Sequence, residues 1–65
     1  MKTINGQTVR LGQLVKTGLQ ITCEVSIIKK IDTEQGVVFV VPLVTTERNG
    51  GHGGWHSACT ITSIN

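Results

Sequence analysis

The run Val37-Val38-Phe39-Val40-Val41-Pro42-Leu43-Val44 decides the fold that this 65-residue sequence predicts. Its β-branched and aromatic residues pack well on a pleated sheet, so a strand is expected over Val37 to Thr46. An antiparallel strand with one face in water alternates apolar and polar residues, and this one does not. Both of its faces should therefore be covered, by the far wall of a barrel or by another subunit. Pro42 cannot donate a ladder hydrogen bond and indicates an edge, a bulge or a bend.

The segment before this run has the pattern of its hairpin partner. Leu19 to Ile31 alternates apolar and polar residues as far as Ile27, which is typical of a strand with one buried face. The period slips at Ile28-Lys29-Lys30, and this predicts a bulge or the exposed end of the strand. Asp32-Thr33-Glu34-Gln35-Gly36 then predicts a hairpin loop, with Gly36 at a positive φ.

The register of this hairpin follows from its apolar residues. A hairpin symmetric about Glu34 places apolar residues of the two strands opposite one another. The predicted pairs are Ile31 with Val37, Ile27 with Val41 and Val25 with Leu43.

Turn signals delimit a first strand near the start of the chain. Asn5-Gly6 and Thr17-Gly18 predict turns on either side of a strand from Gln7 to Val15. Gly12 lies where the apolar phase of that strand changes, which predicts a bulge or bend. A short helical turn over residues 11–15 is the alternative.

The last strand is predicted from Ser57 to Ile64, and no segment predicts a helix with comparable strength. Its inward residues are expected to be Cys59 and Ile61, and its outward residues Thr60 and Thr62. We therefore predict that residues 1–65 form one all-β domain, an antiparallel meander of four to five strands bent into a small SH3-like or OB-like barrel. A chain this short buries only about 60% of its unfolded surface, so a homo-oligomer is expected to complete it.

Composition narrows the classes of partner. The net charge is +2 and the six basic residues are spread along the chain, whereas a dedicated nucleic-acid binder usually has a clustered basic face. Phe39 and Trp55 are the only aromatic residues, too few for a multi-base stacking platform in one subunit. The N-terminal sequence has no apolar signal-peptide region, and the longest apolar run is too short to span a membrane. A cytoplasmic protein without a membrane partner is therefore expected.

A glycine-rich stretch before the last strand is the predicted functional loop. Four glycines in five positions exceed what a hairpin connection needs, which predicts positive φ or close backbone approach to another group. Successive N–H groups in such a turn can form an anion-binding nest, while Trp55 offers a flat surface for a base or sugar. The alternative is a surface loop with Trp55 folded onto the end of the barrel. The predicted ligand-binding residues are Arg48, Asn49, Gly50, Gly51, His52, Gly53, Gly54, Trp55, His56 and Ser57.

Metal binding and catalysis receive less support from the same stretch. His52, His56 and Cys59 have a spacing that permits zinc, with Cys23 as a fourth ligand. Structural zinc sites usually have two close ligand pairs, and Cys23 stands alone, so we predict no metal and two small buried cysteines. A Cys–His nucleophile would need an orienting acid, and no acidic residue is close in sequence. We predict neither an enzyme nor a cofactor.

Two functions of different classes remain. The first is a non-enzymatic oligomeric protein that holds a phosphate-bearing ligand through the glycine-rich loop 48–57. That ligand would be a nucleotide, sequestered or sensed as a signal, or a nucleic-acid backbone. The alternative is a structural or protein-interaction module that uses the apolar strand 37–44, with the glycine loop as a connector.

Overall fold

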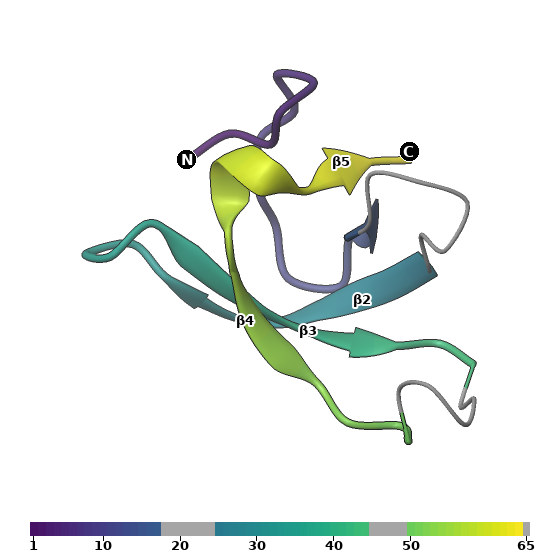
Figure 1. The fold of residues 1–65 in the computed structure, drawn as a ribbon. Coiled ribbons are helices and arrows are strands. Elements are labelled where there is room, and N and C mark those ends of the chain that lie inside the picture. The colour runs from purple at the N-terminus through teal and green to yellow at the C-terminus, as the bar shows by residue number, and fades with distance from the viewer. Residues whose placement is uncertain (18–24, 45–49, 65) are drawn as a thin grey trace.

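A computed structural model describes residues 1–17, 25–44 and 50–64 and shows a five-stranded antiparallel sheet (Figure 1). The predicted all-β antiparallel class is confirmed, with one short 3-10 helix, Ala58–Thr60, as the only helical element of the described residues. The strands are β1 (Leu14–Lys16), β2 (Val25–Asp32), β3 (Val37–Pro42), β4 (Gly54–Ser57) and β5 (Thr62–Ser63).

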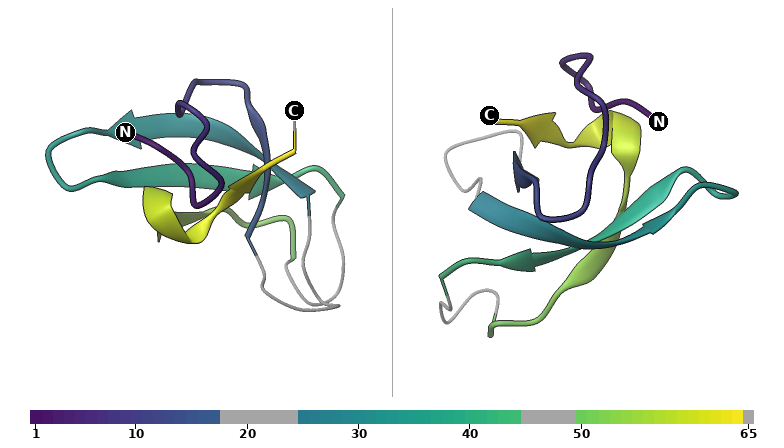
Figure 2. Two further views of the ribbon diagram at one scale, coloured as in Figure 1. Left: turned by 90° about the horizontal axis from the view of Figure 1, so that it is seen from above. Right: turned by 180° about the vertical axis from the view of Figure 1, so that it is seen from behind.

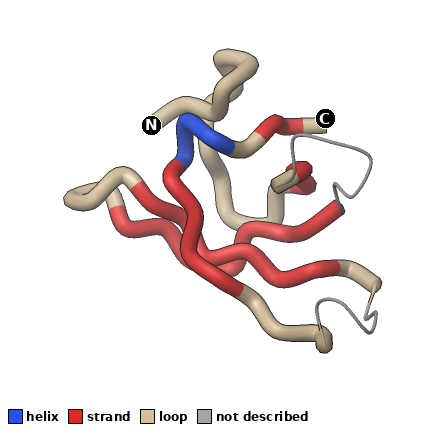
Figure 3. The backbone as a smooth tube through the Cα atoms, in the orientation of Figure 1, coloured by secondary structure: helices blue, strands red, loops and turns tan. Residues whose placement is uncertain are grey.

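The sheet has two free edges, so the predicted closed barrel is wrong. The strand order is β4-β3-β2-β1-β5, in which β1 to β4 form a meander and β5 returns to pair with β1. After β4 the chain turns through the 3-10 helix and crosses to the other edge, as the tube in Figure 3 shows. The two residues of β5 both pair with β1, and within the described ranges no ladder joins β5 to β4.

The β2–β3 hairpin contains the predicted bulge. The ladder shifts register between Ile28 and Lys30, where one residue, Lys29, has no partner on β3. On the side of the bulge away from the hairpin turn, Ile27 pairs with Val41, as predicted.

Between the bulge and the turn, the predicted register is wrong by one residue. Ile31 pairs with Val38 instead of Val37, because the loop joins Asp32 to Val37 and is not centred on Glu34. The loop has the predicted conformation at Gly36, where φ is +70°. The Asp32 carboxylate caps the loop by accepting hydrogen bonds from the backbone N–H groups of Glu34 and Gln35.

The core lies on one face of the sheet, which we call the inner face. Figures 1 and 2 show the N-terminal segment and β5 lying together, above β2 and β3 in the view of Figure 1. The 3-10 helix contributes Ala58 and the residue after it is Ile61, which is fully buried. The buried apolar residues are Val9, Val15, Ile28, Val38, Val40, Ala58 and Ile61.

The N-terminal segment is held to β5 by one side chain. Asn5 donates from Nδ2 to the Ser63 carbonyl oxygen (2.9 Å) and accepts from the Ser63 N–H at Oδ1 (3.1 Å). The predicted Asn5-Gly6 turn is confirmed, with Gly6 at φ +81°. The Asn5-Gly6 turn and the two Asn5–Ser63 hydrogen bonds together place residues 1–9 against the end of the core.

The first predicted strand is shorter than expected. Only Leu14–Lys16 is strand, and the bend predicted at Gly12 is a turn in which the Gln13 N–H donates to the Arg10 carbonyl oxygen. Gly12 has φ +81°, a conformation that ends any helical turn, so the helical alternative over residues 11–15 is wrong.

The predicted last strand, Ser57 to Ile64, is confirmed only at Thr62–Ser63 and is wrong in its first half. β4 begins three residues earlier and ends at Ser57, and the 3-10 helix then separates it from β5. The Thr60 hydroxyl donates to the Ser57 carbonyl oxygen at 2.7 Å, a local bond that competes with strand pairing. Ile61 is buried as predicted, but Cys59 is exposed rather than inward.

Some predictions fall on residues that the structure does not describe. The turn at Thr17-Gly18, the first residues of Leu19 to Ile31 and the end of Val37 to Thr46 lie partly outside the described residues. In the ranges that are described, no helix has the length and apolar character needed to cross a membrane.

Candidate functional site

The predicted glycine-rich site is divided between a turn and a strand. Arg48 and Asn49 lie outside the described residues. Gly50 and Gly51 form a turn with φ values of +58° and +76°, so the positive φ predicted for this stretch is confirmed. The residues from Gly54 onward belong to β4 and pair with β3.

Gly53 is a glycine because two groups of β3 approach it closely. A Cβ at this position would lie 2.6 Å from the Val40 carbonyl oxygen and 2.7 Å from two carbon atoms of the Phe39 ring. Real Cβ atoms do not come this near, so any larger residue must displace β3, Phe39 or the loop. The turn at Gly50 and Gly51 and this packing account for three of the four glycines. Their number is therefore no longer evidence for a ligand.

Strand alternation sends the remaining predicted residues to opposite faces of the sheet. Trp55 pairs with Phe39 and Ser57 pairs with Val37, on the face away from the core, which we call the outer face. His56 pairs with the buried Val38 and lies on the inner face. Trp55 and His56 consequently cannot bind one small ligand together.

The two histidines line one small pocket at the inner face. Its volume is about 200 Å³, and His52, Gly53, Gly54 and His56 of the predicted site contribute to it. Ordinary small-molecule sites occupy about 300–1,000 Å³, so this pocket suits a group of phosphate size rather than a whole nucleotide. The other lining residues are Thr17, Ser26, Val40 and Pro42.

Cys59 is the cysteine of the alternative zinc site, and its side-chain contact is with Ser57 rather than with a histidine. Cys59 is exposed, and its Sγ is 3.4 Å from the Ser57 hydroxyl oxygen. Within the described part of the chain, no group of three or more His, Cys, Asp and Glu side chains is placed to hold a metal ion. Cys23 lies outside the described residues.

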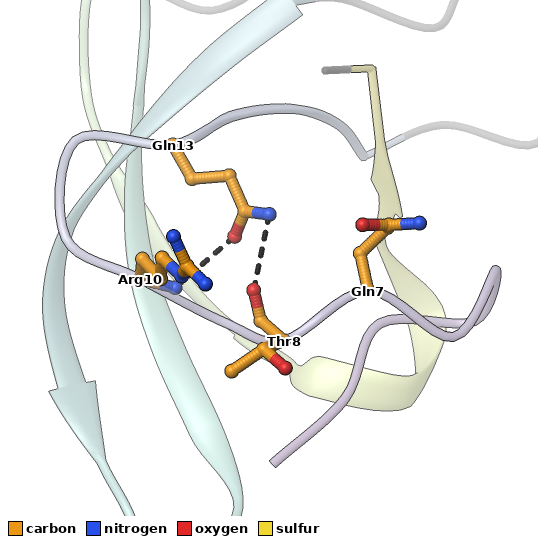
Figure 4. Close-up of a pocket in the computed structure, with 4 residues that line it drawn as sticks. All are labelled: Gln7, Thr8, Arg10 and Gln13. Carbon is orange, nitrogen blue, oxygen red and sulfur yellow. Dashed lines mark hydrogen bonds between the residues drawn. The ribbon is translucent and has the colours of Figure 1, made fainter.

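A second pocket, about 270 Å³ in volume, surrounds Arg10 and was not predicted from the sequence (Figure 4). Gln13 accepts at Oε1 from the Arg10 N–H and donates from Nε2 to the Thr8 carbonyl oxygen and the Ser63 hydroxyl. These bonds use the Gln13 amide to hold the Arg10–Gln13 turn. The turn signal at Gly12 predicts that residues 10 and 13 approach each other, but nothing in the sequence predicts that Gln7 joins them.

The outer face of β2, β3 and β4 carries apolar side chains together with the exposed Lys30. Phe39 lies at its centre and meets Trp55 edge to face, with ring centroids 5.4 Å apart and an interplanar angle of 64°. The Lys30 ammonium lies 5.6 Å from the Phe39 ring centroid on the other side. Of the outward residues, Leu43 and Trp55 are each 52% exposed. The ladder pairs place seven apolar residues of the described chain on this face: Leu14, Val25, Ile27, Val37, Phe39, Val41 and Trp55. Leu43 continues the alternation past the end of β3, where its N–H donates to the Val25 carbonyl oxygen.

The outer face also has a hollow at one end. It has a volume of about 390 Å³ and lies between the hairpin loop and the aromatic pair. Val37 and Trp55 supply its apolar wall, and Asp32 and Gln35 its polar wall. A protruding apolar side chain would fit such a hollow.

Comparison with known proteins identifies no relative. No family model, no curated protein and no solved structure matches the chain. The assignment of a function therefore depends on the surfaces and pockets described above.

Proposed function

We propose that this chain is a protein-interaction module whose working surface is the outer face of β2, β3 and β4. The supporting observation is the unequal burial of the two faces of β3. Val38 and Val40 on the inner face are buried, whereas Val37, Phe39 and Val41 on the outer face are only half-buried. An apolar surface of this extent on a small domain marks a site where another protein binds.

The outer face has the anatomy of a protein interface. Its centre is aromatic and aliphatic with Lys30 beside Phe39, and two further charged residues, Lys16 of the neighbouring β1 and Asp32, lie at opposite ends. Interfaces commonly combine an apolar, aromatic centre with a polar rim. Trp55 is half exposed beside Phe39. Tryptophan is the kind of residue that contributes most to binding when a partner covers it.

Site-specific photo-crosslinking in the producing cells tests this function. We expect p-benzoylphenylalanine in place of Trp55 to crosslink efficiently to a protein on illumination. The same probe in place of Leu11 is the matched control, because Leu11 is 66% exposed and lies in the Arg10–Gln13 turn, away from the outer face. Equal crosslinking from the two positions, or none from position 55, would contradict the proposal.

The histidine pocket supports a second candidate function, the binding of a phosphate group. Two imidazoles, from His52 and His56, converge there with the hydroxyl-bearing residues Thr17 and Ser26. These are hydrogen-bonding groups suited to a phosphate-bearing ligand, and a nucleotide would place its phosphate in the pocket and its base outside. Because Trp55 lies on the opposite face, it would not stack on that base.

Calorimetric titration with inorganic phosphate and with AMP tests the second candidate. We expect His56→Ala to weaken binding at least tenfold, the effect of losing about one hydrogen bond to a charged group. Arg10→Ala, which changes the other polar pocket, serves as the control and should bind as the unaltered chain does. No heat from the unaltered chain, or equal losses from both variants, would exclude a specific site at the histidines.

A further inference from the structure

We propose that the partner on the outer face is a second copy of this chain, stacked with its strands running in the opposite direction. In this dimer Leu43 of each copy fills the hollow beside Val37 and Trp55 of the other copy. Lys16 of each copy reaches Asp32 of the other. This inference rests on the proposed function and names the occupant of the same surface.

The two ends of the outer face are unlike, and each complements the other. One end carries Lys16 in register with Val25, whose carbonyl oxygen accepts the Leu43 N–H. Among the described residues this end carries the basic Lys16 and an apolar side chain open to a partner, since Leu43 is 52% exposed.

The opposite end is acidic and hollow. Asp32 pairs there with Val37, and both residues line the hollow together with Trp55. A two-fold interface uses the same patch on both subunits, so the patch must complement itself. Only a reversed stacking brings the end with Lys16 and Leu43 onto the hollow acidic end, and the symmetry does so twice.

The middle of the outer face is apolar and fits the same stacking. Phe39 of one copy would lie over Val41 of the other, where both side chains face away from their own cores. The Lys30 ammonium lies 5.6 Å from the Phe39 ring centroid, and Lys30 is beyond the last residue pair of the β1–β2 ladder. In the dimer this side chain would have to turn past the end of β1, so that its ammonium reaches water while its methylenes stay against the interface.

A stable dimer would bury a large share of this small chain. A standard interface takes about 800 Å² from each partner. That is about a fifth of the accessible surface of this chain, which is 4311 Å².

Sedimentation equilibrium combined with tryptophan emission tests the dimer. We expect the mass to rise from 7.0 kDa to twice that value with concentration. Trp55 is the only tryptophan and lines the hollow, so its emission should shift to the blue over the same concentration range. Leu43→Asp should raise the dissociation constant more than a hundredfold. Leu11→Asp, at an exposed leucine outside the face, should leave it unchanged.

A charge substitution tests the direction of stacking. Lys16→Glu replaces two attractions with two repulsions and should raise the dissociation constant about tenfold. Adding Asp32→Asn removes the repulsions without restoring the attractions and should recover about half of that loss in binding free energy. Asparagine retains the side-chain oxygen that accepts from the Glu34 and Gln35 N–H groups, so the hairpin cap is preserved.

Each contrary result has a definite meaning. A dimer that leaves the emission of Trp55 unchanged, or that Leu43→Asp does not weaken, has its interface elsewhere and overturns the inference. A dimer in which Asp32→Asn fails to rescue Lys16→Glu overturns the reversed stacking. A monomer at concentrations up to about 1 mM excludes the second copy. Crosslinking from position 55 to a different protein would then keep the proposed function and reject only this inference.

Discussion

Gly53→Ala is expected to destabilise the folded chain by about 3 kcal/mol, the upper part of the usual range for overpacking. The added Cβ would lie 2.6 Å from the Val40 carbonyl oxygen, a backbone atom that moves only if β3 moves. It would also lie 2.7 Å from the Phe39 ring, whose displacement disturbs the contact with Trp55. A domain of this size has a total stability of only about 3–10 kcal/mol, so the variant should be partly unfolded at room temperature. Urea unfolding followed by circular dichroism measures the difference.

Gly54→Ala is the matched control for this substitution. A Cβ on Gly54 would meet only the far end of the His56 side chain, at 3.8 Å, which is an ordinary contact. We therefore expect a change in the free energy of unfolding within about 0.5 kcal/mol. If the two variants unfold at the same urea concentration, close packing is not the reason for glycine at position 53.

Ile61→Ala is expected to cost about 2–5 kcal/mol, because it removes a fully buried side chain and leaves a cavity. Ile61 has no exposed surface and follows the 3-10 helix, so its side chain fixes the crossing from β4 to β5. Its backbone carbonyl oxygen accepts the Ile4 N–H, which connects the same point to the N-terminal segment. Loss of this side chain should loosen β5 and the N-terminal segment together.

Ile4→Ala provides the comparison at an exposed isoleucine. Ile4 is 58% exposed, and its contact with Ile61 is made by its backbone, which the substitution retains. Thermal unfolding should show a large drop in melting temperature for Ile61→Ala and little change for Ile4→Ala. Comparable drops would mean that Ile61 is not a central core residue.

Local signals in the sequence predicted the bulge and the turn of the central hairpin. The slip at Ile28-Lys29-Lys30 and the glycine at position 36 each have one dominant physical cause, and both predictions are confirmed. The alternation up to Ile27 predicted its apolar residues inward and its polar residues outward, and in the described part this is wrong. Ser26 is buried opposite Val15 on the inner face, while Val25 and Ile27 are half-buried on the outer face.

The register between the turn and the bulge was wrong because the hairpin was assumed to be centred on Glu34. The loop instead joins Asp32 to Val37, and the extra residue of the bulge brings Ile27 back opposite Val41.

The last third of the chain was less predictable. Glycine has low strand propensity, so the start of β4 at Gly54 resembled a loop. The alternation in Ser57 to Ile61 suits a strand, but the hydrogen bond from Thr60 to the Ser57 carbonyl oxygen supports a 3-10 turn instead. The exposure of Cys59 follows from this turn, which periodicity alone does not reveal. The separation of Trp55 from His56 follows from alternation along β4, once this segment is known to be a strand.

The pairing of β5 with β1 has a consequence for the order of folding. β2, β3 and β4 are neighbours both in sequence and in the sheet, so their ladders require only the closure of nearby segments. The ladder between Val15 and Ser63 joins distant parts of the chain and yields only two residue pairs. Hydrogen bonds from Asn5 and Gln13 to Ser63 reinforce it. Pairing β5 with β1 closes most of the chain into a loop, and two residue pairs offset little of that entropy cost until the meander has formed. The rate-limiting barrier should therefore be crossed with the meander formed, and with β5 and the N-terminal segment still unattached.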